Sequence, residues 1–84
     1  IQTPSGSYTV LTTDGIILMA TGTATLFTAV GNKDQRVIVK RLAGATITID
    51  GAGSETIDGA TTKTLSSQYA TLEIVSDGAN WHVI

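Results

Sequence analysis

Apolar and polar residues alternate in short segments along the whole chain. Ile47 and Ile49 alternate with threonines, and Leu72 and Ile74 alternate with polar residues in the same way. Alternation with a period of two is typical of a β-strand with one buried face, and no segment has apolar residues at helical spacing. The pattern predicts about eight short strands, at residues 8–12, 16–20, 24–29, 36–42, 46–49, 62–65, 70–75 and 81–84.

Four Asp-Gly pairs interrupt this pattern. Asp-Gly tolerates the positive φ angles of tight hairpin turns, so each pair is expected to reverse the chain. Short strands separated by such turns predict one all-β domain over residues 1–84, a small antiparallel β-sandwich or jelly-roll-like fold. The pairs are Asp14-Gly15, Asp50-Gly51, Asp58-Gly59 and Asp77-Gly78.

Some of the predicted strands are apolar on both faces. In the run Ile16-Ile17-Leu18-Met19 both faces carry large apolar side chains, and the strand that contains Phe27 has the same property. A domain of this size buries only about 60% of its unfolded surface, too little to cover both faces of several strands. We therefore expect identical copies to cover part of the apolar surface, with Ile17, Met19 and Phe27 at the interface.

Composition and charge narrow the possible functions. The chain has 84 residues, of which 15 are threonine, and its net charge is −2. Acidic residues outnumber basic residues, which argues against a nucleic-acid partner. The longest run of large apolar residues is too short for membrane insertion. With no cysteine in the chain, thiolate metal sites and thiol catalysis are excluded.

The chain offers few groups for catalysis or metal binding. His82 is the only histidine, and no Gly-x-Ser-x-Gly motif accompanies it. Asp50, Glu55 and Asp58 form a cluster in the sequence, but their spacing lacks the EF-hand pattern, and an Asp before Gly already serves a turn. We therefore predict a protein that is not an enzyme and that uses no cofactor and no metal.

Basic and aromatic residues give weaker signals. Arg36 and Lys40 would share one face of a strand and Arg41 the other, a pattern more typical of a solvated face than of a binding patch. Exposed aromatic rings are common platforms for carbohydrate, but Trp81 in so small a domain is expected in the core or in an interface.

The second half of the chain resembles the ending of many tailed-bacteriophage tail fibre and tail spike proteins. The resemblance extends to an earlier stretch and covers most of the chain. It is carried by Tyr8-Thr9-Val10 with Thr13-Asp14-Gly15, by the strand from Arg36 to Arg41 before Thr46-Ile47-Thr48-Ile49-Asp50, by Ser54-Glu55-Thr56-Ile57-Asp58-Gly59-Ala60 followed by Leu65 and Tyr69, and by Val75-Ser76-Asp77-Gly78-Ala79-Asn80-Trp81-His82-Val83-Ile84.

This resemblance implies a homotrimeric distal domain of a fibre or spike, located on the phage tail of the virion and engaged in attachment to the host. Residues 1–6 would be a linker from an upstream shaft. The partners would be copies of the chain and a bacterial surface glycan or another host receptor. By analogy, Asp77, Gly78, Asn80 and Trp81 would shape the last hairpin and its core.

Receptor contacts are expected in loops, because rigid β-scaffolds carry specificity there. The most polar loop predicts Asn32, Lys33, Asp34 and Gln35 as receptor-binding residues. Three alternatives remain open. The first is a trimerisation or assembly cap with no ligand. The second is a carbohydrate-binding module of a cellular protein, with Trp81 and Tyr69 exposed together. The third is a glycan-processing domain that uses the carboxylate cluster.

Overall fold

The computed structural model describes residues 1–84, and it contains eight strands and no helix. All eight predicted strands are present, although β1 and β3 end earlier than predicted. No helix is present that could span a membrane. The strands are β1 (Tyr8–Thr9), β2 (Ile16–Met19), β3 (Gly22–Thr25), β4 (Arg36–Arg41), β5 (Ile47–Asp50), β6 (Thr62–Leu65), β7 (Thr71–Ser76) and β8 (Trp81–Val83).

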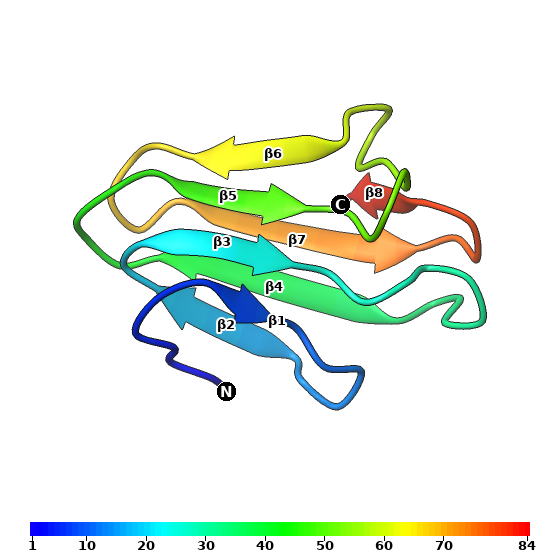
Figure 1. Cartoon of the computed structure of the whole chain (residues 1–84), viewed down its shortest axis with the longest axis horizontal. Helices are drawn as coiled ribbons and strands as arrows, with labels where there is room; N and C mark the ends of the chain where they lie inside the picture. The colour runs from blue at the N-terminus through cyan, green and yellow to red at the C-terminus, as the bar shows by residue number, and fades with distance from the viewer.

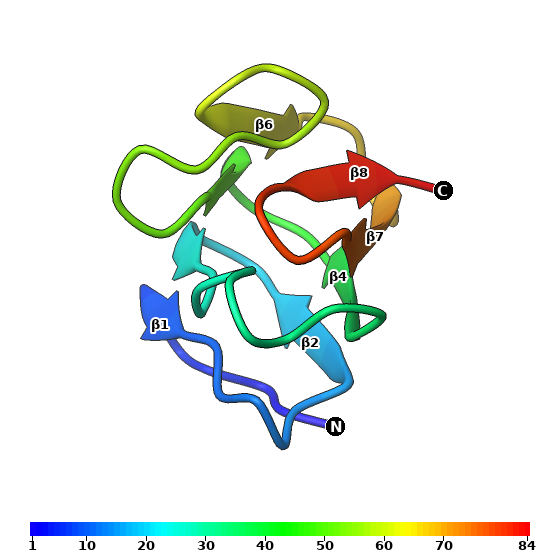
Figure 2. The ribbon, with the colours of Figure 1, turned by 90° about the vertical axis from the view of Figure 1, so that its right-hand side faces the viewer.

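The strands form two four-stranded sheets that lie face to face (Figure 2). Sheet 1 has the order β1-β3-β5-β6, and sheet 2 has the order β2-β4-β7-β8. Successive side chains of a strand point to opposite faces, so each sheet turns one set of residues inward to the other sheet and one set outward. The molecule is thus an all-β sandwich of two layers.

The strand pairing corrects the prediction of an antiparallel sandwich. Three of the pairings, β1 with β3, β3 with β5 and β2 with β4, are parallel. The reason is that the chain crosses to the opposite sheet after each of the first four strands, so consecutive strands do not pair. The pair Asp14-Gly15 lies at the first crossing and is not a hairpin turn. Only β5–β6, β4–β7 and β7–β8 are antiparallel.

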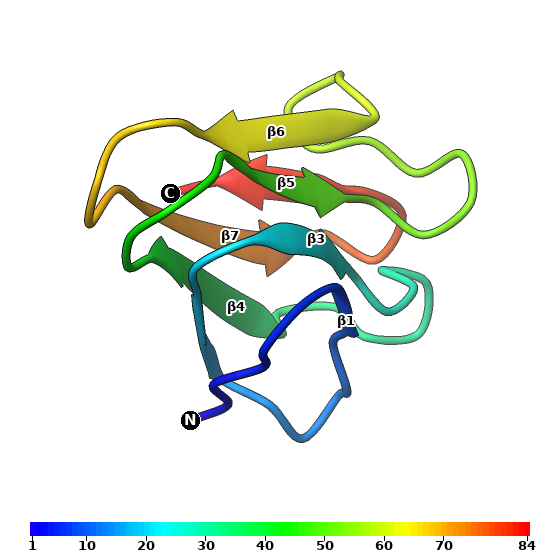
Figure 3. The ribbon, with the colours of Figure 1, turned by 60° about the vertical axis from the view of Figure 1, so that its left-hand side comes forward.

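Consecutive strands run in opposite directions, so their connections lie at two opposite ends (Figures 1 and 3). The connections that follow β1, β3, β5 and β7 lie together at one end, which we call the loop end. It consists of residues 10–15, 26–35, 51–61 and 77–80. The shorter connections that follow β2, β4 and β6 lie at the other end. Loops that are distant in the sequence therefore come to share one surface.

The core lies between the two sheets and corrects the predicted interface. Ile17 and Met19 are 0% exposed in a single chain, because sheet 1 covers the face of β2 to which they belong. They cannot contact another copy. Phe27 is half-buried and packs edge-on against Trp81, with ring centroids 5.2 Å apart. The buried apolar residues are Val10, Ile17, Met19, Ala24, Leu26, Ala29, Val37, Val39, Ile47, Ile49, Ile57, Leu65, Ile74 and Trp81.

The outward faces of the two sheets differ in chemistry. On sheet 1 every outward residue of a strand is a threonine except Asp50: Thr9, Thr23, Thr25, Thr48, Thr62 and Thr64. On sheet 2 the outward residues include Ile16, Leu18, Ile38 and Val75, together with charged side chains.

Arg41 closes the connection between β4 and β5. It lies on the opposite face of β4 from Arg36 and Lys40, as the alternation predicts, and is almost fully buried. Its guanidinium donates to the carbonyl oxygen of Ala45 at 2.7 Å and to that of Gly44. A buried guanidinium that meets backbone carbonyls stabilises a tight connection, since these oxygens would otherwise lack donors.

The glycines of two Asp-Gly pairs differ in how closely the backbone packs around them, and they allow a matched test. A Cβ on Gly51 would lie 2.5 Å from the carbonyl oxygen of Glu55, whereas a Cβ on Gly15 would meet nothing within 4 Å. We expect Gly51→Ala to lower the free energy of unfolding by about 2 kcal/mol, because the backbone at Glu55 must move to make room for the added Cβ. Gly15→Ala should change it by less than about 0.5 kcal/mol. Urea unfolding measures both, and equal effects would contradict this packing.

Candidate functional site

The predicted receptor loop lies at the loop end, in the connection between β3 and β4. Lys33, Asp34 and Gln35 are exposed, and Asn32 is half-buried. The loop holds its own shape: Asn32 donates from its side-chain nitrogen to the carbonyl of Thr28 at 2.8 Å, and the amide of Gln35 donates to the carbonyl of Asn32. These contacts leave the side chains of Lys33, Asp34 and Gln35 facing solvent.

The same loop is fastened to the end of β7. The amide of Asp34 donates to the carbonyl of Ser76, and the amide of Ser76 donates to the carbonyl of Gln35, both at 2.9 Å. The stem of Lys33 lies beside Gly78, where an added Cβ would be 3.6 Å from the Cβ of Lys33. The β3–β4 and β7–β8 connections therefore form one continuous surface.

Glu55 attaches a third connection to this surface. Its carboxylate accepts hydrogen bonds from the backbone amide of Ala29, at 2.8 Å, and from the hydroxyl of Thr28. The sequence indicated a cluster of Glu55 with Asp50 and Asp58, but the three carboxylates have separate places. Asp50 is an outward residue of β5, and Asp58 lies in a tight turn. Glu55 thus joins two loops, a role that its position in the sequence did not reveal.

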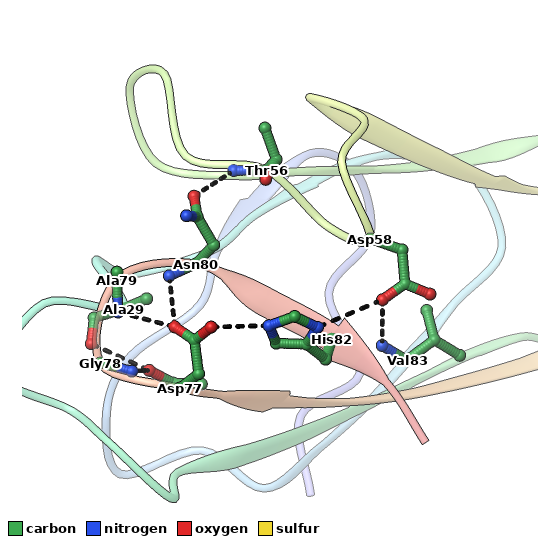
Figure 4. Close-up of polar contacts among 10 residues, drawn as sticks. Ala29, Thr56, Asp58, Asp77, Gly78, Ala79, Asn80, His82 and Val83 are labelled. Atoms are coloured by element: carbon green, nitrogen blue, oxygen red, sulfur yellow. Dashed lines mark hydrogen bonds and ion pairs between the residues drawn. The ribbon is translucent and has the colours of Figure 1, made fainter.

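Asp77 organises the turn between β7 and β8 (Figure 4). Its Oδ1 accepts hydrogen bonds from the amides of Asn80, at 2.7 Å, and Ala79, at 2.8 Å. Its Oδ2 lies 2.6 Å from Nε2 of His82. The bond from the Asn80 amide, then the bond to His82 and the bond from the Ala79 amide lower the pKa of Asp77 to about 2. Gly78 adopts a φ of 96°, which suits glycine.

The last hairpin is also bound to the β5–β6 connection. Oδ1 of Asn80 accepts a hydrogen bond from the amide of Thr56 at 2.9 Å, and Oδ1 of Asp58 accepts one from the amide of Val83 at 3.1 Å. Nδ1 of His82 lies 3.7 Å from the same Asp58 oxygen, so the imidazole is placed between two carboxylates (Figure 4). These contacts fix β8 against the neighbouring loop.

Trp81 supports the loop end from beneath. Its indole is fully buried, and the ring of Phe27 meets it at 75°. Tyr69, which is 59% exposed, lies in the connection between β6 and β7 at the opposite end. The two aromatic residues are not exposed together, so they cannot form the paired platform that the cellular carbohydrate-binding alternative needs.

The loop end is suited to surface recognition. The molecule has no pocket, and none of its groupings of histidine, aspartate and glutamate is placed to hold a metal ion. Both ring nitrogens of His82 lie next to aspartates, and no hydroxyl group is bonded to either of them. The surface offers exposed polar side chains on loops that are held in place by one another.

No protein-family model, curated protein or solved structure matches the chain.

The lowered pKa of Asp77 makes the free energy of unfolding depend on pH in the acidic range. This carboxyl group has a pKa of about 2 in the folded chain, below its ordinary value of 3.8, so it binds fewer protons when folded. Its contribution is complete above about pH 5 and is lost as the pH falls through about 2. Asp77→Asn removes the titrating group while an amide oxygen can still accept from the turn. We expect the urea midpoints of the two proteins to converge between about pH 5 and pH 2. A constant difference across this range would contradict the assignment.

Proposed function

We propose that the chain is the distal domain of a tailed-bacteriophage tail fibre or spike, exposed on the virion, and that it attaches as a homotrimer to a bacterial surface glycan or another host receptor. The mechanism has no catalytic step. The observation that carries the proposal is the loop end, where polar residues from three connections hold exposed Lys33, Asp34 and Gln35 on one surface.

The interlocked loops favour binding because they are ordered before a ligand arrives. A surface whose loops are already fixed loses less conformational entropy on binding than a mobile one does. Specificity on a rigid β-scaffold is commonly carried by such loops, while the sheets only position them. Lys33 and Asp34 provide opposite charges, and the amide of Gln35 provides both a donor and an acceptor for hydroxyl groups.

A shallow surface of this kind binds more tightly when several copies of it engage the same target. Without a pocket, one site can make only a few hydrogen bonds, and a dissociation constant near 1 mM corresponds to about −4 kcal/mol. Three linked sites that engage one bacterial surface can raise avidity by a factor of about 10² to 10⁴. The resemblance to trimeric fibre ends and the rigid loop end therefore support the same mode of action.

A second candidate function is an assembly cap that joins three chains and binds no ligand. The apolar residues on the outward face of sheet 2 favour it, since they offer a surface to other copies. The two candidates share the trimer and differ at the loop end. A binding assay on the intact trimer therefore separates them.

A loop variant with a matched control tests the attachment function. The double substitution Lys33→Ala with Gln35→Ala changes the loop end, and Ser67→Ala with Gln68→Ala changes exposed residues of the connection at the opposite end. The probes are immobilised bacterial lipopolysaccharides, capsular polysaccharides and intact cells. We expect the trimer to bind at least one of them, and the loop-end variant to lose about tenfold or more while the control binds like the original chain.

The outcomes separate the two candidates. A trimer that binds none of these probes would favour the assembly cap. Equal losses in the two double variants would show that the loop end is not the binding surface.

A further inference from the structure

The outward face of sheet 2 differs from that of sheet 1 in having partly exposed apolar residues on three strands. Ile16 and Leu18 of β2 lie beside Ile38 and Lys40 of β4 in the parallel register, and Val75 of β7 follows on the same face. The corresponding face of sheet 1 has no apolar residue. An apolar centre with charged residues around it is the usual composition of a protein–protein contact surface.

The charges on this face are divided between its two halves. The β2–β4 half carries Arg36 and Lys40 and no carboxylate. The β7–β8 half carries Glu73, and the carboxylates of Asp77 and Asp58 flank His82 at its outer edge. Arg36 reaches Glu73 across the boundary only at 3.8 Å, and both side chains remain partly exposed. One half is thus complementary in charge to the other half of a second copy.

The size of the face sets the area of each contact. The molecule measures 33 × 24 × 21 Å, and the shortest dimension lies across the two sheets (Figures 1 and 2). A face of 33 × 24 Å has a projected area of about 800 Å². Each of the two contacts that a protomer makes in a ring uses one half of it, about 400 Å², so a single contact is smaller than a standard interface and the ring depends on all three contacts together. A contact between unlike halves is heterologous, and such contacts close into rings when the rotation allows it.

We propose that the occupant of this face is a second copy of the same chain. The β2–β4 half of one protomer packs against the β7–β8 half of the next, and three such contacts close the ring around Ile16, Leu18, Ile38 and Val75. This inference rests on the proposed trimer and assigns the surface that forms it. It replaces Ile17 and Met19, which the fold buries completely inside the protomer, and Phe27, which packs against Trp81 at the loop end.

Two lysine substitutions on equivalent central strands test the assignment. Ile38→Lys places a charge on the outward face of sheet 2, directly across from Glu73, so the isolated protomer can accommodate it. Thr48→Lys places the same charge on the outward face of sheet 1. Light scattering after size exclusion should give three times 8.7 kDa for the original chain and for Thr48→Lys, and a single chain for Ile38→Lys. Circular dichroism verifies that both variants are folded.

Cysteine substitutions provide a test that disturbs packing less. The chain has no cysteine, so Ile38→Cys and Thr48→Cys each introduce one unique thiol. In the assembled protein the thiol at position 38 should react with a maleimide about tenfold or more slowly than the thiol at position 48. An original chain that is monomeric would overturn the trimer and this inference together. A trimer that survives Ile38→Lys, with equal labelling of both thiols, would overturn only the choice of face.

Discussion

The passage of the chain from one sheet to the other after each of its first four strands is the constraint on which the rest of the structure depends. Because consecutive strands run in opposite directions and these strands enter different sheets, it makes β1 parallel to β3, β3 parallel to β5, and β2 parallel to β4. It also places the apolar residues of both sheets in one core between them. A four-stranded sheet with one apolar face is not stable in water by itself, so each sheet depends on the other.

The polar contacts of the loop end follow from this arrangement. Glu55 can bind the amide of Ala29, and Asn80 can accept from Thr56, only because the connections that follow β3, β5 and β7 lie at the same end. Each loop supplies hydrogen bonds to another, so backbone groups that would otherwise depend on water have fixed partners. The consequence for function is a surface whose shape is set before any ligand is present, and whose exposed side chains are free to make contacts.

The two outward faces have separate consequences. Threonine, which has a branched side chain with a hydroxyl group, gives sheet 1 a face that is compatible with both strand geometry and water. Sheet 2 keeps isoleucine, leucine and valine outside, and a monomer gains nothing from exposing them. In the proposed function the threonine face meets solvent, the apolar face meets other copies of the chain, and the loop end meets the receptor.

The sequence alone determined the eight strands, the alternation within them and the exposure of the loop around Lys33, because these depend on residues that are close together in the chain. It also marked Asp77 and Gly78 as turn residues. It did not determine which face of β2 lies inside, since Ile16 and Leu18 are as apolar as Ile17 and Met19. Strand partners and loop contacts such as Glu55 with Ala29 were decided only by the tertiary structure. Pairing joins residues far apart in sequence, and a period-two pattern is identical whichever sheet a strand enters.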